Sequence, residues 1–169
     1  MKTLNQQRSN SAQPKNSCPR TFRIKNSRPL SRAERNRNPG NIRRSGVRFR
    51  GERQPSIDPS FKEFESEEWG YRAMFVLLYT YQRRYGLDTV AKMIARYAPE
   101  NENHTTAYID VVADRSGVPA NGHITATNGD VMIPIVAAMA RVEIGEEPKL
   151  HEVEEGWKLF ISDWRKKLL

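Results

Sequence analysis

Apolar side chains recur at steps of three and four residues in the part of the chain that follows residue 66. This spacing puts them on one face of an α-helix, whereas strand-like alternation is confined to a few earlier positions. The pattern therefore predicts a mainly α protein, with about five helices after a short extended entry. The helices are expected within residues 66–86, 87–99, 100–119, 127–145 and 153–169.

Polar residues and turn formers set the expected ends of these helices. Ser66 precedes two glutamates and is expected to cap the first helix, and Pro99 is expected to stop the second. The other expected caps are Asp88, Asn103 or Thr105, and Asp130. Gly70 stands inside the first helix, where glycine costs about 1 kcal/mol relative to alanine. Its presence there indicates that another segment approaches the helix closely.

The N-terminal part of the chain shows little periodicity. Residues 1–30 are rich in Asn, Ser, Gln, Pro and Arg, and they are expected to form a disordered basic leader. Residues 31–169 are expected to form a single helical domain. At its start, Ser31 with Glu34 three positions on predicts a short helix with a capping box. The Asn-Pro-Gly-Asn run at 38–41 then predicts a turn.

Charge divides the chain at about residue 55. Residues 1–55 hold 15 Lys+Arg and 2 Asp+Glu, whereas residues 56–169 hold 13 and 18, so the two parts carry +13 and −5. A basic segment attracts polyanions such as nucleic acid, anionic lipid or cell-wall polymers. Non-specific DNA contact through residues 1–55 is one interpretation, and a solvated tail that serves solubility is the simpler one.

Several kinds of chemistry find no support in the sequence. Cys18 is the sole cysteine, which excludes an internal disulfide and a cysteine-based metal site. The three histidines lack metal-ligand spacing, and neither a phosphate-binding loop nor a nucleophile-elbow motif occurs. We therefore expect no metal and no cofactor. We also expect no membrane span and no secretory signal, because the chain lacks the apolar runs that these require.

The polar stretch between Pro99 and Tyr108 is the best candidate for a site. It brings Glu102, Asn103 and Thr105 to the start of a helix. A glutamic acid half-sheltered beside aromatic surface keeps its proton near neutral pH, as cleavage of a glycosidic bond requires, and nearby amide and hydroxyl groups would bind the sugar. The alternative is a plain capping loop, in which the same groups satisfy free backbone N–H groups.

Three motifs, taken in order, resemble a family of small phage and prophage proteins. They are RNRNPGNIR at residues 35–43, WGYRA at 69–73 and APENENHTTAY at 98–108, and the resemblance spans residues 35 to about 118. The family pattern is an RNxNPxNIR turn, a GxRA helix and an AP–EN–T–Y segment. Members are described as virion structural proteins, and some as lysozyme-like or lytic transglycosylases. The resemblance therefore implies a lysozyme-like helical domain in a virion-associated protein that degrades peptidoglycan.

The resemblance also implies roles for individual residues. Glu102 becomes the expected catalytic acid and then base. One such group suffices for a lytic transglycosylase, because a hydroxyl of the substrate replaces water as the nucleophile. A hydrolase would require a second carboxylate, for which Glu34, Glu68 and Glu100 are candidates. The turn is expected to border the cleft, and the residues expected to bind the glycan are Asn38, Asn41, Arg43, Arg72, Asn103, Thr105 and Tyr108.

Two other functions stay open. The chain can be a non-enzymatic virion component whose basic leader contacts DNA or the capsid. A sequence-specific DNA-binding regulator fits less well, because the helix that would read DNA, at residues 105–115, carries two acids and one arginine. The expected location is the virion, or the bacterial cytoplasm before assembly, with action in the periplasm and cell wall if the protein is an enzyme. The expected partners are peptidoglycan strands and other virion proteins.

Overall fold

A computed structural model describes residues 28–100 and 104–166 of the protein. The prediction of a mainly α protein is confirmed. The helices of this part are α1 (Arg32–Asn36), α2 (Glu67–Tyr85), α3 (Val90–Tyr97), α4 (Thr105–Ser116), α5 (Gly129–Ile144) and α6 (Leu150–Lys166). Most of the predicted basic leader lies outside the described residues, so its disorder stays a prediction, as does the lysozyme-like form of the domain. Within the described residues, no helix is both long and apolar enough to cross a bilayer.

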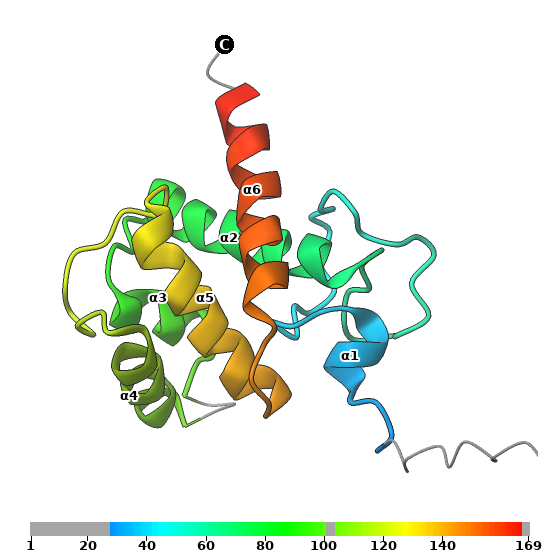
Figure 1. Ribbon diagram of the computed structural model, residues 1–169, viewed down its shortest axis with the longest axis horizontal. Helices are drawn as coiled ribbons and strands as arrows, with labels where there is room; N and C mark the ends of the chain where they lie inside the picture. Colours follow the sequence, from blue (N-terminus) through cyan, green and yellow to red (C-terminus); the bar gives the residue numbers. More distant parts are fainter. Residues whose placement is uncertain (1–27, 101–103, 167–169) are drawn as a thin grey trace, which may run out of the picture.

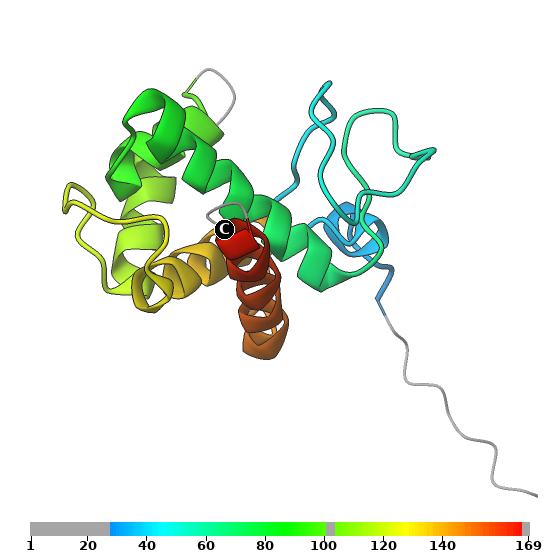
Figure 2. The ribbon, with the colours of Figure 1, turned by 90° about the horizontal axis from the view of Figure 1, so that it is seen from above.

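The central helix is α2. It runs from the loops that follow α1 toward α3 and α5, and α6 stands across it (Figures 1 and 2). Its most deeply buried stripe is Tyr71, Met74, Phe75 and Leu78, at helical spacing. Of the predicted stripe, Ala73 is completely buried, and Trp69, Val76 and Tyr81 are half-buried and pack against the core. Leu77 is half-buried as well. The helix packs against neighbours on more than one side, so its buried face is wider than one stripe and is rotated from the predicted one.

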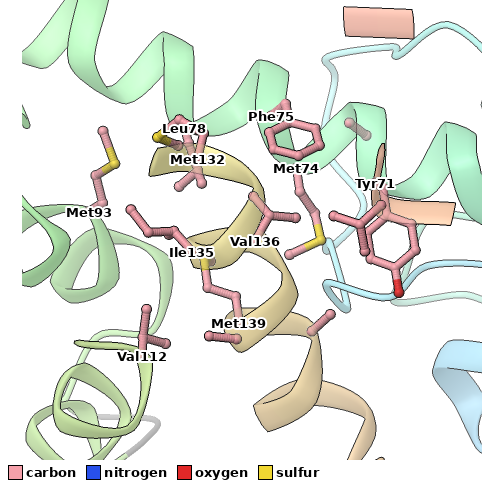
Figure 3. Close-up of a cluster of buried hydrophobic side chains, with 14 of the residues drawn as sticks. Tyr71, Met74, Phe75, Leu78, Met93, Val112, Met132, Ile135, Val136 and Met139 are labelled. Atoms are coloured by element: carbon pink, nitrogen blue, oxygen red, sulfur yellow. The ribbon is translucent and has the colours of Figure 1, made fainter. Parts of the chain in front are cut away.

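The hydrophobic core lies where α2, α3, α4 and α5 meet (Figure 3). Its methionines, such as Met93, Met132 and Met139, are completely buried, and their unbranched side chains fill the irregular gaps between helices. Between α2 and α6 the core becomes aromatic. There Phe75 packs edge-on against Trp157, with 5.1 Å between ring centroids, and stacks on Phe160 at 6.1 Å. These contacts hold α6 against α2, the helix that contributes four residues to the candidate site.

Two predicted helix starts are confirmed. Ser31 and Glu34 form the expected capping box at α1: the Ser31 N–H donates to the Glu34 carboxylate at 2.7 Å, and the Glu34 N–H donates to Ser31 Oγ at 3.3 Å. Ser66 holds the N-cap position of α2 in extended conformation, although its side chain makes no capping bond. Both starts follow directly from residue type and spacing.

Three other helix starts differ from the prediction by one or two residues. The N-cap of α3 is Thr89, whose hydroxyl accepts the Lys92 N–H, while Asp88 instead pairs with the Lys92 ammonium. The N-cap of α5 is Asn128 rather than Asp130, which lies in the first turn. The N-cap position of α4 is His104, one residue before the alternative Thr105. The other alternative, Asn103, lies outside the described residues.

Residues 37–66 form a region without regular secondary structure, which we call the loop region. The predicted extended entry is reduced to two isolated antiparallel bridges, Arg43–Phe61 and Glu52–Phe64. Buried polar side chains hold the region together. The Lys62 ammonium, in a residue only 1% exposed, donates to the Glu52 carboxylate at 3.0 Å and to the Val47 carbonyl at 2.7 Å.

Gly70 confirms the predicted close approach to the first long helix. A methyl group added there would overlap the Arg37 carbonyl oxygen and the Pro39 ring. The segment that needs the space is therefore the Asn-Pro-Gly turn itself. Contact between α2 and this turn fixes the loop region against the helices, and the candidate site lies at their boundary.

Candidate functional site

A cavity of about 610 Å³ lies between the loop region and the helices, a volume in the range of small-ligand sites. The loop region contributes the turn at 40–43 and the rings of Phe49 and Phe61, and α1 contributes Arg32. On the other side, α2 contributes four half-buried residues: Val76, Leu77, Thr80 and Tyr81. The end of α3 adds Tyr97 and Ala98, and the last turn of α5 adds Glu143.

The predicted turn at 38–41 is present, and the Asn41 N–H donates to the Asn38 carbonyl at 3.0 Å. Asn38 is completely buried, and its amide nitrogen donates to the carbonyls of Ile42, at 3.0 Å, and Lys62, at 2.9 Å. Its side-chain oxygen accepts the Ile42 N–H at 2.9 Å. All three bonds join parts of the loop region to one another. Asn38 thus fixes the shape of the turn from the buried side, whereas residues 40–43 line the cavity.

Gly40 and Tyr97 join the turn to α3. The Tyr97 hydroxyl donates a hydrogen bond to the Gly40 carbonyl. A methyl group on Gly40 would overlap that hydroxyl and the Met74 side chain, so only glycine admits this contact. Burial, with the neighbouring Glu143 carboxylate, raises the pKa of Tyr97 well above its ordinary value, so the hydroxyl keeps its proton and stays a donor.

Glu143 is held between two donors at the edge of the cavity. The Asn41 amide donates to one carboxylate oxygen at 3.1 Å, and the Tyr108 hydroxyl donates to the other at 3.0 Å. Asn41 has a left-handed backbone, with φ of 45°, which asparagine tolerates better than most residues. The turn, α4 and α5 therefore converge on one carboxyl group.

The surroundings of Glu143 favour its protonated form. Burial raises the pKa of this carboxyl group, because removal from water disfavours the charge, and the bonds from Asn41 and Tyr108 lower it by a smaller amount. Burial also raises the pKa of Tyr108, with help from the nearby Glu143, so its hydroxyl stays a donor. Chemically, the arrangement is an oriented carboxylic acid that is able to give up and regain a proton.

The structure brings some of the predicted site residues to this cavity and leaves others elsewhere. Asn41 and Arg43 line it, and Tyr108 lies behind Glu143. Arg72 does not line it: this side chain is buried against Asp163 of α6, with 2.7 Å between the charged groups, and stacks on Trp69. The Arg72 contacts hold α2 to α6.

The remaining predicted residues belong to the segment between α3 and α4. Thr105 is buried, and its hydroxyl donates to the Ala98 carbonyl, which ties the start of α4 to the end of α3. Glu100 is exposed to solvent. Glu102 and Asn103 lie outside the described residues, so the roles assigned to them stay predictions.

The sequence reasoning missed Glu143, although two signals were present. Met139 follows the buried Val136 by three positions, and Glu143 follows Met139 by four, so all three lie on one face of α5. The carboxyl group of Glu143 therefore points toward the interior. Glu143 also stands in the last turn of a helix, where the helix dipole disfavours a negative charge. An acid in that place on an apolar helix is therefore a candidate for a site.

Metal chemistry has no visible support in this part of the molecule. Across residues 28–100 and 104–166, no three side chains of His, Cys, Asp or Glu lie close enough together to hold a metal ion. The expectation of no cofactor stays a prediction.

Comparison with known proteins places this helical chain in a family of phage proteins. No family model matches it. It is 36% identical over 132 residues to "Protein P5" of Pseudoalteromonas phage PM2, in an alignment that covers 76% of this chain and 81% of that protein. The chain therefore belongs to the same family as Protein P5 of this phage. The match agrees with the phage family that the three motifs resemble.

Proposed function

We propose that this chain is a virion-associated protein that cleaves the glycan strands of peptidoglycan, with Glu143 as the acid and base. The observation that supports this proposal is the half-buried carboxyl group of Glu143 at the edge of a cavity of about 610 Å³, oriented by Asn41 and Tyr108. A general acid must hold a proton near neutral pH, and burial shifts the pKa of Glu143 upward, in the direction that this role needs. Membership in a phage protein family supports the association with virions.

The lytic transglycosylase route fits the cavity better than hydrolysis by two carboxylates. Glu143 is the sole carboxylate among the described residues that line the cavity, and two-carboxylate hydrolysis requires a second acid across the scissile bond. In the single-acid route, the Glu143 carboxyl group protonates the glycosidic oxygen as its bond to the anomeric carbon breaks. The resulting carboxylate then takes the proton of a hydroxyl on the same sugar, and the oxygen of that hydroxyl bonds to the anomeric carbon. No water is consumed.

The lining of the cavity suits a sugar. Phe61 and Tyr81 contribute aromatic side chains to the lining, and Asn41, Ser45 and Thr80 contribute polar ones, of the kind that bind sugar hydroxyls. Such a mixture of aromatic side chains with a few polar groups is the usual lining of a small-molecule site.

The test measures release of soluble fragments from purified murein by the wild type and by Glu143→Gln. Loss of a general acid is expected to slow release by about 100–10,000-fold, because glutamine keeps the shape but has no proton to transfer. Glu155→Gln is the matched control, since Glu155 is an exposed acid of α6 that does not line the cavity. Products of the wild type are expected to be lighter than hydrolysis products by one water.

The outcomes distinguish Glu102, the acid that the sequence indicates, from Glu143, the acid that the structure indicates. If Glu102→Gln abolishes release and Glu143→Gln does not, Glu102 is the acid and the proposed role of Glu143 is wrong. If the wild type releases nothing from the murein of several hosts, the enzymatic proposal fails.

A second candidate function rests on charge. The net charge of +13 on residues 1–55, together with the phage family, supports a non-enzymatic virion component whose basic leader contacts DNA. This function predicts DNA binding that weakens steeply with salt and is lost when residues 1–30 are removed. Binding that survives the truncation unchanged would count against it.

A further inference from the structure

Two tyrosines follow each other along α2, from the cavity toward the end of the helix. Tyr81 lines the cavity and is half-buried. Tyr85 comes four residues later, so the two side chains lie on the same side of α2, about 6 Å apart along its axis. That separation is close to the length of one sugar unit in a glycan strand. Tyr85 therefore lies next to the part of the cavity that Tyr81 lines, further along α2.

Arg96 of α3 packs against both tyrosine rings. Its guanidinium group lies 3.8 Å from the centre of the Tyr85 ring and 5.2 Å from the centre of the Tyr81 ring. A guanidinium group over the face of an aromatic ring is attracted by the negative charge of that face. Because one arginine contacts both rings, it ties the position of Tyr85 to that of Tyr81 and to the last turn of α3. We call Tyr81, Tyr85 and Arg96 the tyrosine stack.

Tyr85 stays accessible to a ligand although Arg96 packs on its ring. The residue is 52% exposed, whereas every other aromatic side chain within residues 28–100 and 104–166 is buried or half-buried. Contact with a ligand would remove apolar ring surface from water, which is favourable. The ring is already held by Arg96, so a ligand would lose less free energy in ordering it.

A sugar ring fits such a surface. The C–H groups of a pyranose form an apolar face, whereas its hydroxyl groups lie around the edge. The apolar face packs on an aromatic ring and buries apolar surface of both partners. This contact does not depend on charge, so it is available to each sugar of a glycan strand, with or without a peptide attached.

From this arrangement we propose that the tyrosine stack is a distal subsite, where a sugar beyond those in the cavity packs on the Tyr85 ring. The inference rests on the proposed function and narrows its substrate to glycan strands long enough to extend past the cavity. Such a strand is bound at two places, with Glu143 at the bond that is cut and Tyr85 further along. The protein is therefore expected to prefer long strands to short ones.

The experiment measures how the affinity depends on glycan length. The probes are peptide-free murein glycans of two, four, six and eight sugars, and calorimetry measures their binding to full-length Glu143→Gln, which keeps them intact. We expect the eight-sugar glycan to bind about tenfold or more tightly than the two-sugar glycan, because only the longer one contacts the exposed ring. An affinity that does not depend on length overturns the subsite.

Variants then assign the length preference to the tyrosine stack. Tyr85→Ala, added to Glu143→Gln, is expected to lower the ratio of the eight-sugar to the two-sugar affinity about tenfold. Tyr85→Phe keeps the ring and is expected to keep the ratio. Arg96→Ala removes the group that positions Tyr85 and is expected to lower the ratio by less than Tyr85→Ala does. A ratio of two affinities does not depend on the fraction of the protein that is folded.

Leu150→Ala is the matched control for loss of an exposed apolar side chain. Leu150 is 54% exposed, begins α6 and does not line the cavity. Its replacement is expected to leave the affinities for all four glycans unchanged. A drop in the length preference in this variant as large as in Tyr85→Ala would contradict the assignment to Tyr85.

The possible failures are distinguishable. If Tyr85→Ala keeps the length preference, the subsite is overturned, and release of murein fragments by the wild type would leave the proposed function standing. If a duplex DNA binds the protein and Tyr85→Ala abolishes that binding, while glycan length has no effect, the stack serves nucleic acid and the subsite is again overturned. Absence of binding by glycans of every length, together with inertness of the wild type on murein, overturns the proposed function itself.

Discussion

The helical part of the molecule and the loop region are stabilised by different kinds of side chain. In the helices, the largest completely buried side chains are apolar, such as Phe75 and Met139. In the loop region, Asn38, Lys62 and Glu63 are buried as well, and each bonds to backbone atoms.

The reason for the difference is the backbone. A helix pairs its own N–H and C=O groups, so its buried side chains are free to be apolar. A folded segment without helix or sheet pairs only part of those groups with one another and leaves the others to side chains. The Glu63 carboxylate, for example, accepts the N–H groups of Ile57 and Asp58, each at 2.7 Å. The candidate site lies where these two kinds of structure meet, and each contributes one side of the cavity.

The largest expected effect is in the helical part. Phe75→Ala removes a ring that packs against Trp157 and Phe160, and it should lower the free energy of unfolding by about 3–5 kcal/mol, through lost burial and the cavity left behind. Urea denaturation followed by circular dichroism measures the change. Val111→Ala, at an exposed position of α4, should cost less than about 0.5 kcal/mol. Similar values for the two variants would contradict the assignment of Phe75 to the core.

This contrast also explains how far the sequence predicted the fold. Periodic apolar spacing predicted the helices from residue 66 onward, because a packed helix repeats its buried face every three or four residues. The loop region has no such repeat. Lys62 stands in the string FKEFES and is of a residue type that usually lies at the surface. Its neighbours in sequence do not indicate that its ammonium group binds Glu52 and the Val47 carbonyl. Only the turn at 38–41 was predictable, because its residues have strong local preferences.

The candidate site was predictable only on the side that a motif marks. Asn41 and Arg43 belong to the RNRNPGNIR string, whose polar residues around a Pro-Gly turn drew attention to it. Glu143 meets Asn41 across 102 positions of sequence, and a contact of that range leaves no trace in local spacing. The acid was visible only as an anomaly on an apolar helix.

A smaller effect on the free energy of unfolding is expected in the loop region, when a buried charged side chain is replaced by an apolar one like those in the helices. Lys62→Met keeps the length of the side chain and removes its charge, which leaves the Glu52 carboxylate buried without its cation. We expect the free energy of unfolding to fall by about 3 kcal/mol, because an uncompensated buried charge is costly. In a helix core the same methionine would be stabilising.

The double variant Lys62→Met with Glu52→Gln is the control for this prediction. The amide of glutamine is neutral, and its oxygen can still accept the Phe49 N–H that Glu52 binds at 2.9 Å. The double variant should therefore be more stable than Lys62→Met alone. If the two are equally stable, the ion pair is not what holds the loop region together. Urea denaturation supplies the measurement for all three variants.

The smallest effect is expected at the junction of the two regions, where Glu67 begins α2. Burial, reinforced by the like charge of Glu152, raises the pKa of Glu67 from an ordinary value of 4.5 to about 7. The folded state therefore binds more protons than the unfolded state between these two values, and stability falls as the pH rises through that window. The loss is complete above pH 7. Since the group is partly exposed, water screens the penalty to roughly 1 kcal/mol.

Glu67→Gln removes this penalty, because glutamine carries no charge at any pH. The variant should unfold about 2–4 °C above the wild type at pH 8, and the difference should vanish near pH 4, where Glu67 is protonated in both states. Glu154→Gln, at an exposed position of α6, is the control for the same change of charge at the surface. A variant that is less stable than the wild type at pH 8 would mean that the Glu67 carboxylate stabilises the junction. The junction would then resemble the loop region, where buried carboxylates hold the chain, more than the helices.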